Sequence, residues 1–259
     1  MKQRANLVID VGMHTGEDTA RFLARGFEVV AIEANPQLVE TASETFAEEI
    51  RHGQLTIVSA AISDHRGTAS FGIADSQTLW SSLAPEFIER NERLARTSYR
   101  YVDVDTIPFG DVLDQFGIPY YLKIDIEGYD MMCATALHAY REKPAYLSME
   151  SNVSVNRAAA DAVFGEVAEL WALGYRSFKY VDQKRAAGGV PDDGEGSGGR
   201  WCSAWTTLAV AQALRTHQNL VGFGGRWGTT LPARAYVYSR AKLGRPVGWY
   251  DIHAAQPWR

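Results

Sequence analysis

The chain has 259 residues, of which 46% are hydrophobic and 22% are charged. This composition is that of an ordinary globular protein, and it excludes a disordered chain, a collagen-like repeat and a coiled coil. The length is enough for one large domain or two small ones, and the net charge of −5 does not indicate a general polyanion binder.

Cysteine usage and hydropathy bear on the compartment. The two cysteines, Cys133 and Cys202, are too few for a disulfide scaffold or an all-cysteine zinc site. The first apolar run is broken at Asp10, and no stretch approaches the roughly 18 apolar residues that a membrane helix needs. We therefore expect a cytoplasmic protein that does not enter a membrane.

Short apolar runs alternate with amphipathic segments along most of the chain. The apolar runs predict strands at residues 7–11, 28–32, 55–62, 120–126, 145–149 and 175–181. The segments between them predict helices at residues 15–25, 36–52, 129–140 and 157–173. Between the third and fourth of these strands we expect a hairpin arm at 68–73, a helix at 85–95, a strand at 99–104 and a short helix at 110–116. This alternation predicts an α/β fold with a single doubly wound, mostly parallel sheet.

The character of the sequence changes after residue 183. Six glycines and Pro191 fall between Lys184 and Arg200, which predicts a long loop that either covers a site or is inert. We expect a ligand-binding core over residues 1–183. Residues 184–259 would then form a loop-rich extension that completes the same domain.

A glycine-rich turn follows the first predicted strand. It reads Asp10-Val11-Gly12-Met13-His14-Thr15-Gly16, and a predicted helix comes directly after it. Glycines permit a sharp turn and the close approach of a ligand, which the free N–H groups of the helix would face. Glu33 follows Gly12 by about twenty residues, the spacing at which an acid binds both hydroxyls of a ribose. The sequence therefore predicts a nucleotide site.

The same turn discriminates between classes of nucleotide. A dinucleotide site has the pattern G-x-G-x-x-G, whereas this turn has G-x-x-x-G with His14 in place of the middle glycine. A pyrophosphate would meet the bulk of His14 and the negative charge of Asp10, which argues against a nicotinamide dehydrogenase. A cationic amino acid joined to a ribose, such as S-adenosylmethionine, suits the acids Asp10 and Glu33.

Two carboxylates follow the next strong strand. On a strand, Lys123, Asp125 and Glu127 would share one face, and past its end the carboxylates would approach a ligand bound at the nucleotide site. Either one carboxylate acts as general base, or both bind a divalent cation that activates a hydroxyl group of a second substrate. The alternative is a structural ion-pair cluster with Lys123.

Four strings of residues resemble the FkbM-type methyltransferases. They are Val8-Ile9-Asp10-Val11-Gly12-Met13-His14-Thr15-Gly16, Ala31-Ile32-Glu33-Ala34-Asn35-Pro36, Ala61-Ile62-Ser63-Asp64 and Leu122-Lys123-Ile124-Asp125-Ile126-Glu127-Gly128. The resemblance implies a class I, Rossmann-like enzyme that uses S-adenosylmethionine and commonly methylates hydroxyl groups of natural products and glycans. It also implies a seven-stranded sheet whose last strand, at residues 248–253, is antiparallel. The sequence departs from the family pattern at His14, Ala34 and Tyr129-Asp130.

Carried over position by position, the resemblance implies a set of site residues. The cofactor-binding residues would be Asp10, Gly12, His14, Thr15, Gly16, Glu33, Ala34, Ser63 and Asp64. Asp10 and Gly12 would hold the amino-acid end, Glu33 the ribose, and Ser63 with Asp64 the adenine. The catalytic set would be Lys123, Asp125 and Glu127. The acceptor side is predicted from position in the fold instead: the end of the next strand, the irregular segment after the third strand and the aromatic C-terminal part supply Glu150, Asn152, Ser81, Ser82 and Trp201.

The C-terminal part of the chain differs in charge from the rest. Residues 201–259 carry a net charge of +6 and five of the seven tryptophans, whereas residues 1–200 carry −11. Arginines with aromatic residues suit a sugar, an anionic acceptor or a partner surface. The alternative is that this segment packs on the acidic body by ordinary electrostatics.

The favoured hypothesis is an S-adenosylmethionine-dependent O-methyltransferase that acts on a small-molecule natural product or a sugar. The alternatives are a nitrogen, peptide or nucleic-acid acceptor, or a non-catalytic nucleotide-binding module. Asp125 and Glu127 weigh against the non-catalytic module. The chain has no Asn-Pro-Pro-Tyr-type motif for an exocyclic amine, so a nucleic-acid partner is not favoured. Homo-oligomerisation and a metal requirement stay open.

Overall fold

The structure is a computed structural model of the chain, and it describes residues 1–150, 159–182, 202–203 and 250–257. Its contacts divide the chain into two units, Met1–Ala145 and Tyr146–Arg259. The glycine-rich stretch predicted to form a long loop, residues 184–200, lies outside the described residues.

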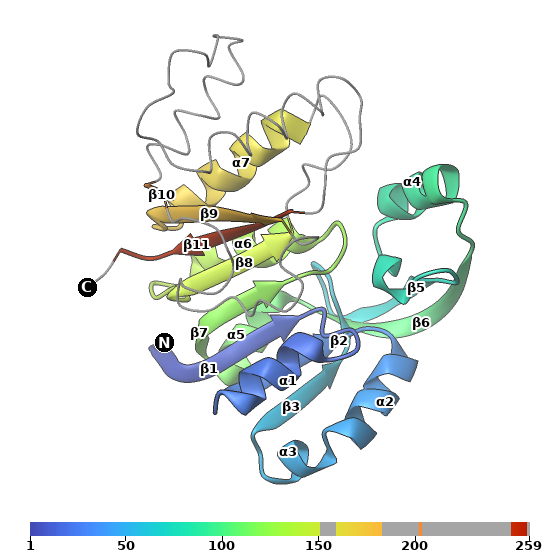
Figure 1. Cartoon of the computed structure of the whole chain (residues 1–259), viewed down its shortest axis with the longest axis horizontal. Coiled ribbons are helices and arrows are strands. Elements are labelled where there is room, and N and C mark those ends of the chain that lie inside the picture. The colour runs from blue at the N-terminus through green and yellow to red at the C-terminus, as the bar shows by residue number, and fades with distance from the viewer. Residues whose placement is uncertain (151–158, 183–201, 204–249, 258–259) are drawn as a thin grey trace. The chain divides into compact units, whose positions relative to one another are not determined.

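Four parallel strands form the sheet of the first unit. They are β1 (Gln3–Val11), β2 (Glu28–Glu33), β3 (Leu55–Ser59) and β7 (Ile118–Ile124), in the order β7-β1-β2-β3 (Figure 1). The chain therefore starts in the middle of the four and continues outward on one side before it returns on the other. This places the switch in strand order between β1 and β7, where ligands of doubly wound sheets bind.

Helices cover both faces of these strands. α1 (Glu17–Ala24) lies in front of the strands in Figure 1 and α5 (Phe109–Phe116) behind them, and α5 contacts α6 (Asp130–Ala136). The predicted helix at 36–52 is two helices, α2 (Pro36–Thr45) and α3 (Ala47–Arg51), because the backbone leaves helical geometry at Phe46. The predicted helix at 129–140 ends in a 3-10 turn, η2 (Leu137–Ala139). None of the helices in the described residues is long and apolar enough to cross a membrane.

An arm with its own small sheet is inserted before α5. It comprises β4 (Ala61–Ile62), β5 (Gly67–Ala74), η1 (Thr78–Trp80), α4 (Pro85–Ala95) and β6 (Tyr99–Ile107). β6 pairs with β4 in parallel and with β5 in the antiparallel sense. An apolar cluster of Ala61, Phe71, Ile73 and Val104 forms its core. The strand predicted at 55–62 is therefore wrong as one element, since β3 ends at Ser59 and β4 belongs to the second sheet.

The second unit contains β8 (Tyr146–Glu150), α7 (Ala159–Ala172), β9 (Ser177–Asp182), β10 (Cys202–Ser203) and β11 (Tyr250–Ala255). β11 lies between β8 and β9 and is antiparallel to both, as expected for the final strand. β10 is antiparallel to β9. The described strands are therefore of mixed direction in an α/β fold, and one mostly parallel seven-stranded sheet is not confirmed.

The packing of α1 on the sheet provides a test of the core. The side chain of Phe22 is 2% exposed, and its ring centroid lies 5.5 Å from that of Tyr121 on β7. We expect Phe22→Ala to lower the free energy of unfolding by about 3–5 kcal/mol in urea titrations, because it leaves a cavity. Ile50→Ala, at a residue that is 36% exposed, is the control and should cost less than about 1 kcal/mol. Equal losses would contradict this packing.

Candidate active site

A cavity lies at the carboxyl ends of β1, β2 and β7, within the first unit. Its lining residues come from the turn after β1, the end of β2, the β3–β4 link, the arm and the turn after β7. They are Gly12, His14, Ile32, Glu33, Ala34, Ala60, Ala61, Ile62, Phe71, Thr78, Leu79, Ser81, Leu83, Asp125, Ile126, Glu127 and Tyr129. The cavity thus brings together the predicted nucleotide turn, the predicted ribose acid and both predicted carboxylates. Thr78, Leu79 and Leu83 were not predicted to belong to the site, because an irregular segment carries no periodic signal.

The turn after β1 depends on Gly12. Its φ angle of 86° lies in the left-handed region, and its N–H donates to the Ile32 carbonyl at 2.9 Å. A Cβ at this position would lie 1.9 Å from the carbonyl oxygen of Asp125. Gly12 is therefore required because the backbones of two turns come into contact, in addition to any role in admitting a ligand.

His14 and Glu33 join the turn to the end of β2. The backbone N–H of His14, at a φ of 52°, donates to Glu33 Oε2 at 2.8 Å. His14 Nε2 lies 2.8 Å from Thr78 Oγ1 on the arm. Burial lowers the pKa of His14, while the charge of Asp125 opposes this shift. Thr15 is exposed, and Gly16 caps the start of α1 with a φ of 81°. His14 thus connects the turn, the sheet and the arm.

Glu33 is buried at the rim of the cavity. Its Oε1 accepts from the Asn35 N–H at 2.8 Å, so each carboxylate oxygen holds one backbone hydrogen bond. Burial raises the pKa of Glu33, and the N–H donors of Asn35 and His14 lower it. A carboxylate oxygen has two lone pairs and can accept more than one hydrogen bond. The Glu33 oxygens can therefore accept from the two hydroxyls of a ribose.

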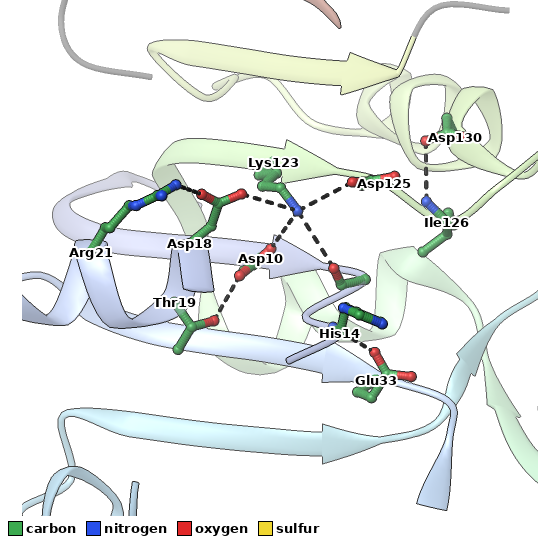
Figure 2. Close-up of polar contacts among 11 residues, drawn as sticks. Asp10, His14, Asp18, Thr19, Arg21, Glu33, Lys123, Asp125, Ile126 and Asp130 are labelled. Carbon is green, nitrogen blue, oxygen red and sulfur yellow. Dashed lines mark hydrogen bonds and ion pairs between the residues drawn. The ribbon is translucent and has the colours of Figure 1, made fainter. Parts of the chain in front are cut away.

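Asp10 lies behind the turn and does not line the cavity. It is completely buried, with Oδ2 accepting from Thr19 Oγ1 at 2.7 Å and Oδ1 lying 3.3 Å from Lys123 Nζ (Figure 2). Burial raises the pKa of Asp10, and the charge of Lys123 opposes this shift. Asp10 supports the turn after β1 through Thr19 and Lys123, and its contact with the amino-acid end of a cofactor stays a prediction.

The two predicted carboxylates stand in the turn after β7. β7 ends at Ile124, so Asp125 and Glu127 do not share a strand face with Lys123 as predicted, and Glu127 adopts a φ of 47°. Asp130 holds this turn by accepting from the N–H group of Ile126 at 3.3 Å (Figure 2) and from that of Gly128 at 3.2 Å. Burial, with the charge of Asp125, raises the pKa of Asp130 to about 6. The sequence signal for Asp130 was its place in the first turn of a predicted helix.

The predicted acceptor residues have different surroundings. Ser81 lines the cavity, whereas Ser82 is 1% exposed and donates to the Glu127 carbonyl at 2.7 Å. Ser82 also accepts from the Ala84 N–H at 2.9 Å, so it braces the turn after β7 against the arm. Glu150 ends β8 in the second unit. Asn152 and Trp201 lie outside the described residues.

Ser63 and Asp64 do not line the cavity; the preceding residues Ala60, Ala61 and Ile62 do. The Asp64 side chain is 80% exposed and bonds to His65 Nδ1 at 2.5 Å. This contact, with a hydrogen bond from Ser63, lowers the pKa of Asp64. The adenine role predicted for this pair depended on one continuous strand to residue 62, and the arm replaces that strand.

A family model described as the methyltransferase FkbM domain matches residues 10–155, more than half of the chain. No curated protein matches the sequence. Several of the solved structures that resemble this chain are methyltransferases. A methyltransferase FkbM from Methylobacillus flagellatus KT is 15% identical, with a TM-score of 0.38 over 58% of this chain and 34% of that one. A precorrin-6y C5,15-methyltransferase from Geobacter metallireducens GS-15 is 13% identical, with a TM-score of 0.40 over 99% and 82%.

A third is a phosphoethanolamine N-methyltransferase 2 of Haemonchus contortus in complex with S-adenosyl-L-methionine. It is 9% identical, with a TM-score of 0.40 over 100% of this chain and 50% of that one. This chain thus spans about a third of the first of these proteins. At such TM-scores the similarity by itself establishes no activity.

The contact between the two turns can be tested with a pair of glycines. Gly12 and Gly53 both have a positive φ, but a Cβ at Gly53 would meet nothing within 4 Å. Gly12→Ala should therefore lower the free energy of unfolding in urea titrations far more than Gly53→Ala does. Gly53→Ala reports the cost of the φ angle alone, about 1 kcal/mol. We expect the two losses of free energy to differ by more than about 3 kcal/mol. Similar losses for the two variants would show that the turns are not in contact.

Asp130 predicts a dependence of stability on pH. Its pKa is raised from 3.8 to about 6 by burial, so the folded protein binds this proton more tightly than the unfolded chain. The contribution of Asp130 to stability is therefore fullest below pH 4 and is lost as the pH rises to 6, by up to about 3 kcal/mol. The difference in unfolding free energy between wild type and Asp130→Asn should shift by this amount between pH 4 and 7. A constant difference would contradict the prediction.

Proposed function

The chain belongs to the FkbM methyltransferase family, and we propose that it binds S-adenosylmethionine in the cavity of the first unit and methylates a hydroxyl group of a small-molecule natural product or a sugar. The observation that carries the proposal is the carboxylate of Glu33. It is buried at the rim of the cavity and held by the backbone N–H groups of His14 and Asn35, and its oxygens can accept from the hydroxyls of a ribose.

The residues around Glu33 fit the rest of this cofactor. Gly12 and His14 border the cavity on one side, and Ala34, Ala61 and Phe71 offer apolar surface for an adenine ring. When bound, the cofactor supplies a methyl group on a cationic sulfonium. Carboxylates at the same cavity favour a cation and disfavour a pyrophosphate. We also propose that the backbone of Thr15 and Gly16, on the helix side of the turn, faces the cofactor.

Asp125 and Glu127 would act on the acceptor side. Both line the cavity, with Ser81 and Leu79 of the arm. Either carboxylate can accept the proton of a bound hydroxyl. Methyl transfer also gains from alignment and from the exclusion of water, for which the arm supplies a wall. Glu150, Asn152 and Trp201 remain proposed acceptor contacts, and a divalent cation at the carboxylates remains a proposal that a chelator can test.

The cofactor proposal is tested by calorimetry with S-adenosylmethionine. Glu33→Gln keeps the size of the side chain but replaces one acceptor oxygen with a donor, so it should weaken binding roughly tenfold to a hundredfold. Glu44→Gln makes the same change at an exposed residue of α2 and should bind as wild type does. A wild-type protein that binds no S-adenosylmethionine would refute the proposed function.

The acceptor is sought with methyl-labelled S-adenosylmethionine and mass spectrometry. Hydroxylated small molecules and sugars are compared with amines and peptides, each with added magnesium and with chelator. Label on a hydroxyl oxygen supports the proposal, and label on nitrogen alone contradicts its acceptor class. Turnover that survives the chelator would remove the cation from the proposal.

A further inference from the structure

The ammonium group of Lys123 stands at the convergence of four oxygen atoms (Figure 2). Lys123 Nζ lies 3.3 Å from Asp10 Oδ1 and 3.5 Å from the Gly12 carbonyl oxygen. It lies 3.6 Å from Asp18 Oδ2 and 3.6 Å from Asp125 Oδ2. The Lys123 side chain is 12% exposed and that of Asp10 is completely buried, whereas the Asp125 carboxylate is 44% exposed.

The four oxygens come from four different parts of the first unit. Asp10 belongs to β1, Gly12 to the turn that follows it, Asp18 to α1, and Asp125 to the turn after β7. Gly12 lines the cavity on the side assigned to the cofactor, and Asp10 and Asp18 lie behind that side without lining it. Asp125 lines the side assigned to the acceptor. The Lys123 ammonium therefore connects the two sides of the cavity.

The surroundings of Lys123 disfavour a role in proton transfer. Three carboxylates within 4 Å stabilise the charged ammonium, which has no free lone pair to act as a base. Lys123 is also not among the residues that line the cavity. It therefore has no direct route to a reacting atom.

We propose that Lys123 is a positioning residue, which holds the turn after β1 and the carboxylate of Asp125 in one arrangement and thereby sets the affinity for the cofactor. The proposal rests on the proposed function. Loss of the ammonium would leave Asp10 buried without its cation, remove a donor from the Gly12 carbonyl and release Asp125. The first effect concerns stability, and the other two concern the shape of the cavity.

The experiment separates these effects with a double variant. Lys123→Met keeps an unbranched side chain without charge, and it should lower the melting temperature by roughly 10 °C through the unpaired Asp10. Asp10→Asn combined with Lys123→Met removes the buried charge and should restore most of that loss. If Lys123→Met alone does not fold, binding of S-adenosylmethionine is measured on the double variant. Lys2→Met, at an exposed residue, controls for the change in net charge.

Binding of S-adenosylmethionine is measured for each variant by calorimetry. The double variant should bind about tenfold more weakly than Asp10→Asn alone, the equivalent of one charge-assisted hydrogen bond. Equal affinity would overturn the proposal, since Lys123 would then serve only to neutralise Asp10.

Amide hydrogen exchange without ligand gives an independent reading. The N–H groups of Gly12, Met13 and His14 are bonded to Ile32 and Glu33, and they should exchange at least about tenfold faster in the double variant than in Asp10→Asn. Unchanged exchange would overturn the proposal. A wild type that binds no S-adenosylmethionine would refute the proposed function, and the exchange rates would still decide whether Lys123 holds the turn.

Discussion

The site depends on the contact between the backbone at Gly12 and the backbone at Asp125. The N–H of Asp125 donates to the Val11 carbonyl at 2.8 Å, and a Cβ at Gly12 would overlap the Asp125 carbonyl oxygen. A parallel sheet aligns the ends of β1 and β7, but it does not by itself bring their turns into contact. The lack of a side chain at Gly12 permits this contact. The glycine-rich turn and the two carboxylates therefore face one cavity.

Buried charge reinforces this contact from below. Asp10 and Lys123 are neighbours in the register of β1 and β7, and both are shielded from water. Removing either partner would leave a charge in a medium that solvates it poorly. Asp130 acts in the same region on the backbone of the second turn, through two N–H groups. Asp10, Lys123 and Asp130, which do not line the cavity, therefore fix backbone positions. The polar side chains that line the cavity are available to bind ligands.

Much of the first unit follows from periodicity and spacing. The runs that become β1, β2 and β7, the glycine turn and the position of Glu33 were all predictable, because each depends on local sequence. The division between β3 and β4 was not, since an apolar run does not specify which strand it pairs with. Asp10 and Ser82 were assigned to ligands because spacing shows that a polar side chain is near a site, but not which way it points. Thr78 acts through a hydrogen bond to His14, which is far away in the sequence, and no local pattern reveals such a contact. Asp130 bonds to nearby N–H groups, and its place in the first turn of a predicted helix was the signal for it.

The arm has a consequence for how this protein can diversify. It has an apolar cluster of its own, and its two ends, β4 and β6, run side by side in parallel. The segment between β5 and β6 contributes Thr78, Leu79, Ser81 and Leu83 to the cavity, yet none of them takes part in the four-stranded ladder. Exchanges at Leu79, Ser81 or Leu83 can therefore reshape one wall of the cavity and leave the register of β1, β2 and β7 intact. Thr78 and Ser82 are constrained, because their hydrogen bonds to His14 and to the Glu127 carbonyl connect the arm to the two turns.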